Sequence, residues 1–257
     1  MKEHSNYLSD NKGKGLFIKS LQLEGDEQMA IDLMLLEKII SDSNFSMAMR
    51  FYTWFGNWLS IGKNQKDIPK RWLELHHLRK LKIVRRPSGG NAVLHSGGLT
   101  YSLVWDSPPK KKKESYLLAS KWLVDGFKQL GINLNSGTES SLYNDKNCFA
   151  TSTAADLIDE KGQKRVGSAQ YWKNGHLLQH GEILISPPKD LWLEVFNTCP
   201  PKPLGLSISQ GQIINLLKKS LISNWSNINW QNHSLSKEEI TEVKNNYENH
   251  LPKELFS

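Results

Sequence analysis

Two hydrophobic periods run along the chain, one typical of helices and one typical of strands. Between residues 26 and 40, apolar side chains recur at Met29, Leu33, Leu36 and Ile40. This spacing of three and four residues predicts an amphipathic helix. Further helices are predicted over 114–130, near 188–197 and 209–224, and from Ser236, where Glu239 completes a capping box.

Short apolar runs bounded by turn residues predict strands. They are SMAMRFYTW (46–54), WLSIG (58–62), LKIVRR (81–86) and LTYSLVW (99–105). Within 165–185, the pair Asn174-Gly175 separates two alternating runs, which is a strong hairpin signal. Because hairpins dominate the centre, we expect an α+β fold with a mixed or antiparallel central sheet flanked by helices, rather than a doubly wound parallel sheet.

Charge and composition narrow the possible partners and the compartment. The 257 residues carry a net charge of +7, which suits an acidic partner, but the basic residues are dispersed and form no nucleic-acid-binding motif. No apolar run approaches the length of a membrane span, and the first residues do not resemble a secretory signal. Cys148 and Cys199 lack metal-ligand spacing and are too few for a disulfide framework. We therefore expect a cytoplasmic protein with reduced thiols and no membrane or nucleic-acid partner.

A glycine-rich segment, RRPSGGNAVLH (85–95), lies between two predicted strands. A tight turn explains one glycine pair. Arg85 and Arg86 are adjacent, and since neighbouring strand residues point to opposite faces, at least one should face the loop. Glycines allow a ligand close to the backbone, and amide hydrogens beside a guanidinium suit an anionic or carbonyl-bearing group. The residues alone leave both a structural turn and a binding loop open.

Three further elements could carry chemistry, and each also has an ordinary structural explanation. A lone lysine is usually a solvated charge, a strand histidine usually packs, and a single cysteine is usually a small buried apolar residue. The elements are Lys164 before Gly167-Ser168-Ala169, the run Gln179-His180-Gly181, and Cys148.

Taken together and in order, these elements resemble a known family. The glycine-rich loop, Cys148, GQKRVGSAQ (162–170) and LLQHGEILI (177–185) are similar to motifs of the lipoate–protein ligase A family, within the biotin/lipoate protein ligase superfamily. MAIDLMLLE (29–37) and WLSIGKNQ (58–65) resemble its first helix and the strand before its binding loop. The resemblance implies a catalytic domain over 25–225 with a class II aminoacyl-tRNA synthetase/biotin synthetase-like fold. Residues 1–24 would form an N-terminal extension and 226–257 a C-terminal helical extension.

Within that superfamily, departures from the ligase pattern indicate the chemistry. ATP-dependent lipoate ligases tend to have three loop glycines and an Asn-Asp pair before the lysine. This chain has Asn91 and Ala155-Asp156 at those places, and Ser96 where many relatives have Asp. Cys148, ahead of Lys164, is placed as in the cysteine-dependent octanoyltransferases. The resemblance therefore favours octanoyl or lipoyl transfer through a cysteine thioester. An ATP-dependent lipoate or biotin ligase and a non-catalytic acyl-binding protein are the alternatives.

The resemblance also implies roles for individual residues. It makes Cys148 the nucleophile and Lys164 its activating cation, with no cofactor and no metal. The donor would be octanoyl-acyl carrier protein, and the acceptor a lipoyl-domain protein, either the glycine cleavage H protein or a dehydrogenase E2 subunit. The expected substrate-binding residues are Arg85, Arg86, Ser88, Gly89, Gly90, Asn91, His95, Gly167, Ser168, Ala169, Gln179, His180 and Gly181.

Overall fold

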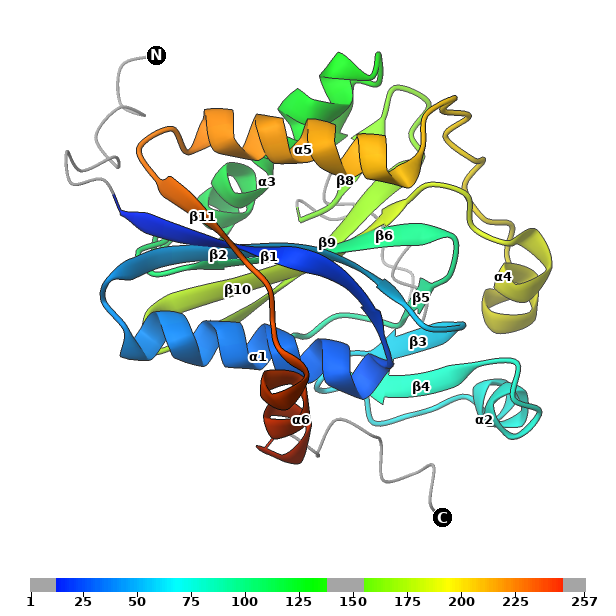
Figure 1. Cartoon of the computed structure of the whole chain (residues 1–257). Helices are drawn as coiled ribbons and strands as arrows, with labels where there is room; N and C mark the ends of the chain where they lie inside the picture. Colours follow the sequence, from blue (N-terminus) through cyan, green and yellow to red (C-terminus); the bar gives the residue numbers. More distant parts are fainter. Residues whose placement is uncertain (1–12, 138–154, 247–257) are drawn as a thin grey trace.

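The computed structural model describes residues 13–137 and 155–246. Its main feature is an eight-stranded mixed sheet with the strand order β11-β1-β2-β6-β10-β9-β8-β7 (Figure 1). The strands are β1 (Lys14–Leu23), β2 (Phe45–Trp54), β6 (Gly98–Trp105), β7 (Leu134–Ser136), β8 (Leu157–Asp159), β9 (Lys164–Lys173), β10 (His176–Leu184) and β11 (Asn229–His233). β1 runs parallel to β2 and β11, and the other pairings are antiparallel.

A second sheet of three strands, in the order β4-β3-β5, lies at one end of the first. Its strands are β3 (Trp58–Ile61), β4 (Lys82–Arg85) and β5 (Val93–His95). The helices are α1 (Gly25–Ser41), α2 (Lys70–His77), α3 (Lys112–Gln129), α4 (Lys189–Phe196), α5 (Gln210–Asn224) and α6 (Lys237–Asn246). The predicted α+β class with a mixed central sheet is confirmed.

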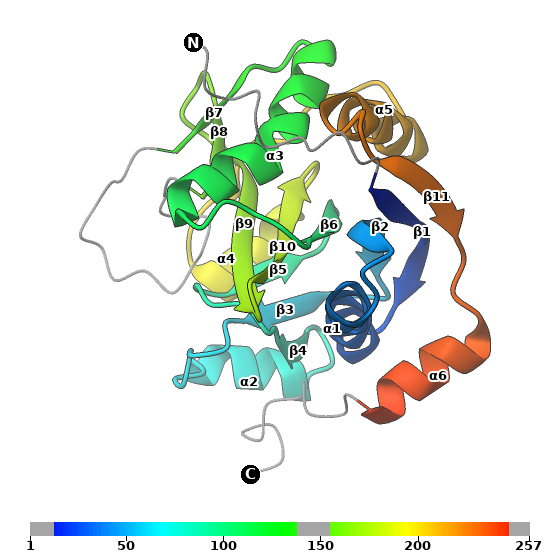
Figure 2. The ribbon, with the colours of Figure 1, turned by 90° about the vertical axis from the view of Figure 1, so that its left-hand side faces the viewer.

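Helices cover both faces of the large sheet (Figures 1 and 2). On one face, α3 and α5 bury an apolar core that includes Phe51, Tyr101 and Trp122. On the other face, α1 packs on the sheet through its apolar side chains, and α6 lies beside α1. The small sheet forms its own core with α2 and α4. The end of α1 nearest this small sheet is where the two sheets and the helix meet.

Most local predictions are confirmed because they rest on short-range patterns. The hairpin β9–β10 turns at Asn174 and Gly175, whose φ values of 50° and 81° are the positive angles of a type I′ turn. The predicted capping box is present at the start of α6, where Ser236 and Glu239 exchange backbone-to-side-chain hydrogen bonds. Helices over the other predicted ranges begin and end within a few residues of their expected limits.

Long-range pairing was not visible in the sequence. β2 and β3, which follow one another closely, belong to different sheets, and the chain leaves the first sheet at Gly56. The expected extensions, 1–24 and 226–257, contain β1 and β11, and both strands pair within the large sheet. β11 has no alternating apolar pattern because it is a largely exposed edge strand.

A buried ion pair fastens α1 to β2. Arg50 donates from Nε and Nη2 to Asp32 Oδ1 at 2.9 and 2.6 Å, and the two side chains are 2% and 0% exposed. Arg50 also donates to the side chain and carbonyl of Gln28 and lies 3.9 Å from the ring centre of Tyr52. Because all three guanidinium nitrogens of Arg50 donate hydrogen bonds, these bonds offset much of the desolvation cost of the two charges.

Removing one partner of this pair is therefore expected to destabilise the fold strongly. Arg50→Met should lower the free energy of unfolding by about 3 kcal/mol or more, because it leaves the Asp32 carboxylate buried without its cation. The matched control is Lys121→Met, which breaks the exposed Lys121–Asp125 pair on α3 and should cost less than about 1 kcal/mol. Urea denaturation measures both variants, and similar losses for the two would contradict this account.

Candidate functional site

A small cavity of about 30 Å³ lies where the glycine-rich loop meets α1, β9 and β10. Its apolar lining comes from Met29, Val93 and the ring of Tyr52. The predicted site residues that line it are Arg86, His95, Gly167, Ser168, Ala169, His180 and Gly181. The tertiary structure thus brings Arg86, which follows β4, together with residues from β5, β9 and β10 that are far apart in the sequence.

Arg86 shapes the glycine-rich loop from within. Its guanidinium donates to the carbonyls of Gly89 at 2.7 Å, Asn91 at 2.6 Å and Ser60 at 2.8 Å. The described residues contain no cis peptide, and in a trans peptide the N–H points away from the preceding carbonyl. The amide hydrogens that follow Gly89 and Asn91 therefore point away from Arg86. The expectation that one of the two arginines faces the loop is met by Arg86.

Arg85 points the other way and holds the segment after β3. Its Nη1 donates to the carbonyls of Gly62 at 3.1 Å and Gln65 at 2.6 Å. Gly62 itself packs under the loop, since a Cβ at this position would lie 1.9 Å from the carbonyl oxygen of Gly90. By contrast, a Cβ at Gly89 would meet nothing within 4 Å. The loop is tightly supported on one side and open at Gly89.

A chain of three side chains links α1 to the loop. His180 Nδ1 lies 2.9 Å from Asp32 Oδ2, and its Nε2 lies 2.5 Å from Ser88 Oγ. In the tautomer that carries its hydrogen on Nδ1, directed at Asp32, Nε2 accepts from the Ser88 hydroxyl. Burial raises the pKa of Asp32, but the charge of Arg50 and the hydrogen bond from His180 outweigh it, so this pKa lies below its ordinary value. The carboxylate is a fixed acceptor that orients His180 and, through it, Ser88.

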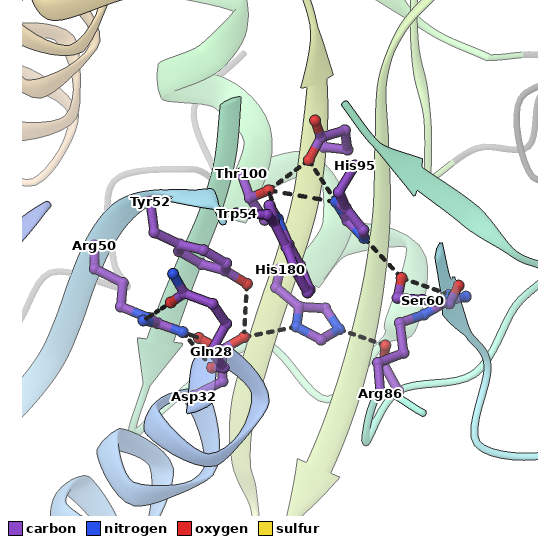
Figure 3. Close-up of polar contacts among 12 residues, drawn as sticks. Gln28, Asp32, Arg50, Tyr52, Trp54, Ser60, Arg86, His95, Thr100 and His180 are labelled. Carbon is purple, nitrogen blue, oxygen red and sulfur yellow. Dashed lines mark hydrogen bonds and ion pairs between the residues drawn. The ribbon is translucent and has the colours of Figure 1, made fainter. Parts of the chain in front are cut away.

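A second carboxylate–histidine–serine chain approaches from the other side (Figure 3). His95 Nδ1 lies 2.7 Å from Glu182 Oε2, and His95 Nε2 lies 2.8 Å from Ser60 Oγ. Thr100 donates to the same Glu182 oxygen at 2.5 Å and accepts from Trp54 Nε1 at 2.7 Å. The Trp54 indole stacks on the His95 ring with centroids 4.0 Å apart. His95, Thr100 and Glu182 of this cluster line the cavity.

The environment of His95 favours its neutral form. Burial lowers the pKa of His95, and the nearby Glu182 carboxylate only partly opposes this shift. Neutral imidazole has one N–H, so Nδ1 donates to Glu182 and Nε2 accepts from Ser60. Ser60 Oγ in turn lies 3.3 Å from Arg86 Nη1. The histidine is therefore held in one tautomer and one ring orientation.

The predicted residues of β9 and β10 divide between the two faces of the sheet. Ser168 and Gln179 point toward α3, where each is hydrogen-bonded to the Tyr101 hydroxyl, at 2.8 and 2.9 Å. Burial raises the pKa of Tyr101 to about 12, so the phenol stays protonated. Gly181 faces the same way, because a Cβ there would lie 2.7 Å from the Tyr101 ring. His180 and its in-register partner Ala169 face α1 instead.

Lys164 is buried, and the explanation as a solvated surface charge is wrong. Its Nζ lies 3.0 Å from Asp156 Oδ1, and the two side chains are 3% and 5% exposed. The Asp156 carbonyl accepts from the amide of Gly137 at 2.8 Å, which joins the two flanks of the segment that contains Cys148. Cys148 lies outside the described residues. Cys199 is described and is a free, exposed thiol.

Sequence reasoning missed several residues that complete this site. Glu182 was detectable in principle, since it lies two residues after His180 and so shares its face. Thr100 was not, because only the pairing of β6 with β10 places it opposite Glu182. Tyr101 reads as an ordinary core residue, and Asp32 as one polar position in a helix motif. Within 13–137 and 155–246, no group of three or more His, Cys, Asp or Glu side chains is placed to hold a metal ion.

The lowered pKa of His95 predicts a loss of stability on mild acidification. Below its ordinary pKa of about 6.5, the unfolded chain binds a proton that the folded His95 resists, so the free energy of unfolding falls as the pH drops. The limiting slope is about 1.4 kcal/mol per pH unit. In His95→Gln, the free energy of unfolding, measured by urea denaturation at each pH, should change less between pH 6.5 and 5 than in the parent protein. His77→Gln, at an exposed position on α2, is the control and should show the same dependence on pH as the parent. An equal dependence in all three proteins would contradict the assignment to His95.

Comparison with solved structures agrees with this architecture. A T. acidophilum protein described as a lipoate protein ligase, solved with bound lipoic acid, superposes with a TM-score of 0.75. It is 17% identical, and the match covers 92% of this chain and 95% of that one. A lipoate-protein ligase A bound with ATP gives a TM-score of 0.74 at 17% identity, covering 92% of this chain and 95% of that one. At these identities the likeness concerns the fold alone, and the predicted ligase-like fold is confirmed.

Relatives found by sequence have a higher sequence identity to this chain than the two solved structures do. An octanoyltransferase LipM from Brevibacillus brevis is 39% identical over 63% of this chain and 63% of the relative. One from Carboxydothermus hydrogenoformans is 38% identical over 68% of this chain and 66% of its own length. The matches thus span slightly less than two thirds of these relatives. No helix in the described part of the chain has the length and apolar character of a membrane span. The model of the lipoyl protein ligase A/B catalytic domain matches residues 24–203, and the chain belongs to that family.

Proposed function

We propose that this protein transfers an octanoyl group, or a lipoyl group, from acyl carrier protein to a lysine of a lipoyl-domain protein through a thioester on Cys148. The observation that carries the proposal is the buried Lys164. It leads into the Gly167-Ser168-Ala169 stretch that lines the cavity, and its partner Asp156 flanks the segment with Cys148. A buried ammonium beside a cysteine-bearing segment suits stabilisation of a thiolate. The names of the relatives, octanoyltransferase LipM, support the same reaction.

The proposed reaction has two acyl transfers. In the first, the Cys148 thiolate attacks the carbonyl carbon of the donor thioester, the new C–S bond forms, and the carrier thiolate leaves and takes up a proton. In the second, the neutral amine of the acceptor lysine attacks the Cys148 thioester. An amide forms, a proton is released, and the Cys148 thiolate is regenerated. Thioester exchange is nearly isoenergetic and amide formation from a thioester is downhill, so neither step needs nucleotide.

Each acyl transfer passes through a tetrahedral intermediate with a negatively charged oxygen. Amide hydrogens held in advance at that position are an effective form of stabilisation. In the glycine-rich loop, Arg86 fixes the carbonyls of Gly89 and Asn91, so the following amide hydrogens face away from it. The amide of Gly90, beside the open position at Gly89, is our candidate for the oxyanion donor. Ser88, held by His180, sets the start of this turn.

The acyl chain would occupy the apolar part of the cavity between Met29, Tyr52 and Val93. The present volume of about 30 Å³ holds about two water molecules and not eight carbons. Acyl binding therefore requires a rearrangement of the side chains that line the cavity. Beside Gly89 the space is open, since a Cβ there would meet nothing within 4 Å. The net charge of +7 suits acyl carrier protein and lipoyl domains, which are acidic partners.

The first test is the acyl-enzyme itself. Incubation with octanoyl-acyl carrier protein, in EDTA and without ATP, should add one octanoyl group that hydroxylamine removes. Cys148→Ser should abolish this adduct, because a hydroxyl is a far weaker nucleophile than a thiolate. Cys199→Ser is the matched control and should label normally, since Cys199 is exposed and far along the chain from the motif. Intact-mass spectrometry follows both variants.

Each other outcome selects an alternative. A strict requirement for ATP and magnesium would place the protein among the ligases. Binding of acyl carrier protein without any covalent adduct would favour a non-catalytic acyl-binding protein. Equal labelling of Cys148→Ser and Cys199→Ser would exclude Cys148 as the nucleophile.

The second test concerns Lys164. Without its ammonium, the Cys148 thiolate loses its nearest proposed cation, so Lys164→Ala should slow acyl-enzyme formation at least 100-fold and move iodoacetamide labelling of Cys148 to higher pH. Lys164→Arg keeps the charge but not the shape, so only partial recovery is expected. Unfolding curves are needed beside the rates, because the alanine variant leaves Asp156 buried without its partner. Unchanged labelling profiles in both variants would remove Lys164 from the mechanism.

A further inference from the structure

A chain of uncharged polar side chains lies where the β9–β10 hairpin packs against α3. In bonded order its members are Trp172, Gln170, Gln179, Tyr101 and Ser168. The four successive hydrogen bonds are 3.2, 2.9, 2.9 and 2.8 Å long. Gln179 and Tyr101, in the middle of the chain, are 0% exposed. Because a buried polar group is costly unless it is hydrogen-bonded, the donors and acceptors of this chain have to match.

The Trp172 end of the chain fixes the direction of its hydrogen bonds. The indole nitrogen of Trp172 is only a donor, so the atom of Gln170 that it meets is the amide oxygen. The amide nitrogen of Gln170 therefore faces Gln179 and donates to its oxygen. The amide nitrogen of Gln179 then donates one hydrogen to the Tyr101 hydroxyl and the other to Ser120 Oγ, at 3.0 Å. Every hydrogen along this part of the chain points toward Tyr101.

Tyr101 can pass this direction on to Ser168. Burial raises the pKa of Tyr101 to about 12, so the phenol keeps its hydrogen. Its oxygen already accepts from Gln179 and lies 2.8 Å from Ser168 Oγ. If Ser168 donated, Tyr101 would accept two hydrogens, and its own would compete with Gln179 for Ser120 Oγ. If Tyr101 donates, every group is used once, and the Ser168 hydrogen points away from the network.

The place of Ser168 suits a contact with the reacting group. Ser168 lines the small cavity and is half-buried. Among the residues that the structure describes, Tyr101 is the one hydrogen-bond partner of its hydroxyl. After burial, the charge of Asp156 also contributes to the raised pKa of Tyr101, so Asp156 lies near the two hydroxyls. The serine is therefore close to the Lys164–Asp156 pair to which the proposed function assigns a role.

We propose that Tyr101 is a positioning residue for acyl transfer: its hydroxyl donates to Ser168 Oγ, so that the Ser168 hydrogen is directed at the carbonyl oxygen of the acyl group. The inference rests on the proposed function. A donor held in advance stabilises the negative charge that develops on this oxygen without any reorganisation. Gly181, opposite Ser168 on β10, makes room for the two hydroxyls, since a Cβ there would lie 2.7 Å from the Tyr101 ring and 3.0 Å from Ser168 Oγ.

One variant reverses the chain with almost no change of shape. In Gln179→Glu the carboxylate has no hydrogen to donate, so Tyr101 donates to it, and Ser168 donates to Tyr101 instead of to the acyl carbonyl. Acyl-enzyme formation from octanoyl-acyl carrier protein should slow at least tenfold, as it should in Ser168→Ala and in Tyr101→Phe. In the Ser168→Ala background, neither of the other changes should slow it further, because both act through the serine hydrogen.

Ser115→Ala is the matched control. Ser115 Oγ donates to Gln170 Oε1 at 3.1 Å, but Trp172 fixes the orientation of that amide without it. This variant loses a hydroxyl from the same network and should keep the parent rate. A parent-like rate in Tyr101→Phe, an equal loss in Ser115→Ala, or losses that add up in the double variants would overturn the proposal. If Gln179→Glu does not fold, Tyr101→Phe in the two backgrounds decides.

A binding measurement separates this proposal from the proposed function. Octanoate labelled at its carboxyl carbon binds without reacting, and carbon NMR spectroscopy reports the hydrogen bonds to its carboxyl group. The bound signal should move in Ser168→Ala and Tyr101→Phe and stay in place in Ser115→Ala. A signal that does not move in the first two variants, or the absence of binding, would refute the directed serine hydrogen. A parent protein that shows the expected shifts but forms no acyl-enzyme would refute the proposed function alone.

Discussion

The buried carboxylate of Asp32 is the interaction on which the geometry of the site depends. It lies fully enclosed between α1 and the sheet, where it accepts from Arg50, Tyr52 and His180. An isolated charge in this position would be prohibitively unstable, so each partner is required to be in place when α1 docks. One ion pair thereby couples the packing of a helix to the orientation of a histidine in the cavity wall.

Two hydrogen-bonded chains reach the glycine-rich loop, and only the first starts from that carboxylate. His180 links Asp32 to Ser88 in the loop. The second chain starts from Glu182 and runs through His95 to Ser60 and Arg86. The loop is flexible by composition, yet its carbonyls and its serine are fixed by buried side chains. Donors fixed in advance need no reorganisation during a reaction, which is the condition for effective electrostatic stabilisation.

The two faces of the β9–β10 hairpin have separate tasks. Toward α1, His180 helps to line the small cavity that we assign to the acyl chain. Toward α3, the Tyr101 hydroxyl is hydrogen-bonded to Ser168 and Gln179, and none of these three side chains is charged. Burial is the main cause of the raised pKa of Tyr101, and the negative charge of Asp156 adds a smaller contribution in the same direction. In the proposed reaction, the Lys164–Asp156 pair and the apolar cavity are therefore connected by β9, whose residues Gly167, Ser168 and Ala169 are small.

The sequence by itself determined the local elements and the set of residues worth inspecting. Helix α1 and the Asn174-Gly175 hairpin follow from periodicity and turn chemistry, which act over a few residues. The motif order identified Lys164, His180 and the glycine loop. Only the tertiary structure decided which charges meet, because the pairs Asp32–Arg50 and Asp156–Lys164 depend on strand register and helix docking. Register also decided which face each site residue occupies, and β11 joined the sheet without an apolar pattern, since an exposed edge strand needs only backbone hydrogen bonds.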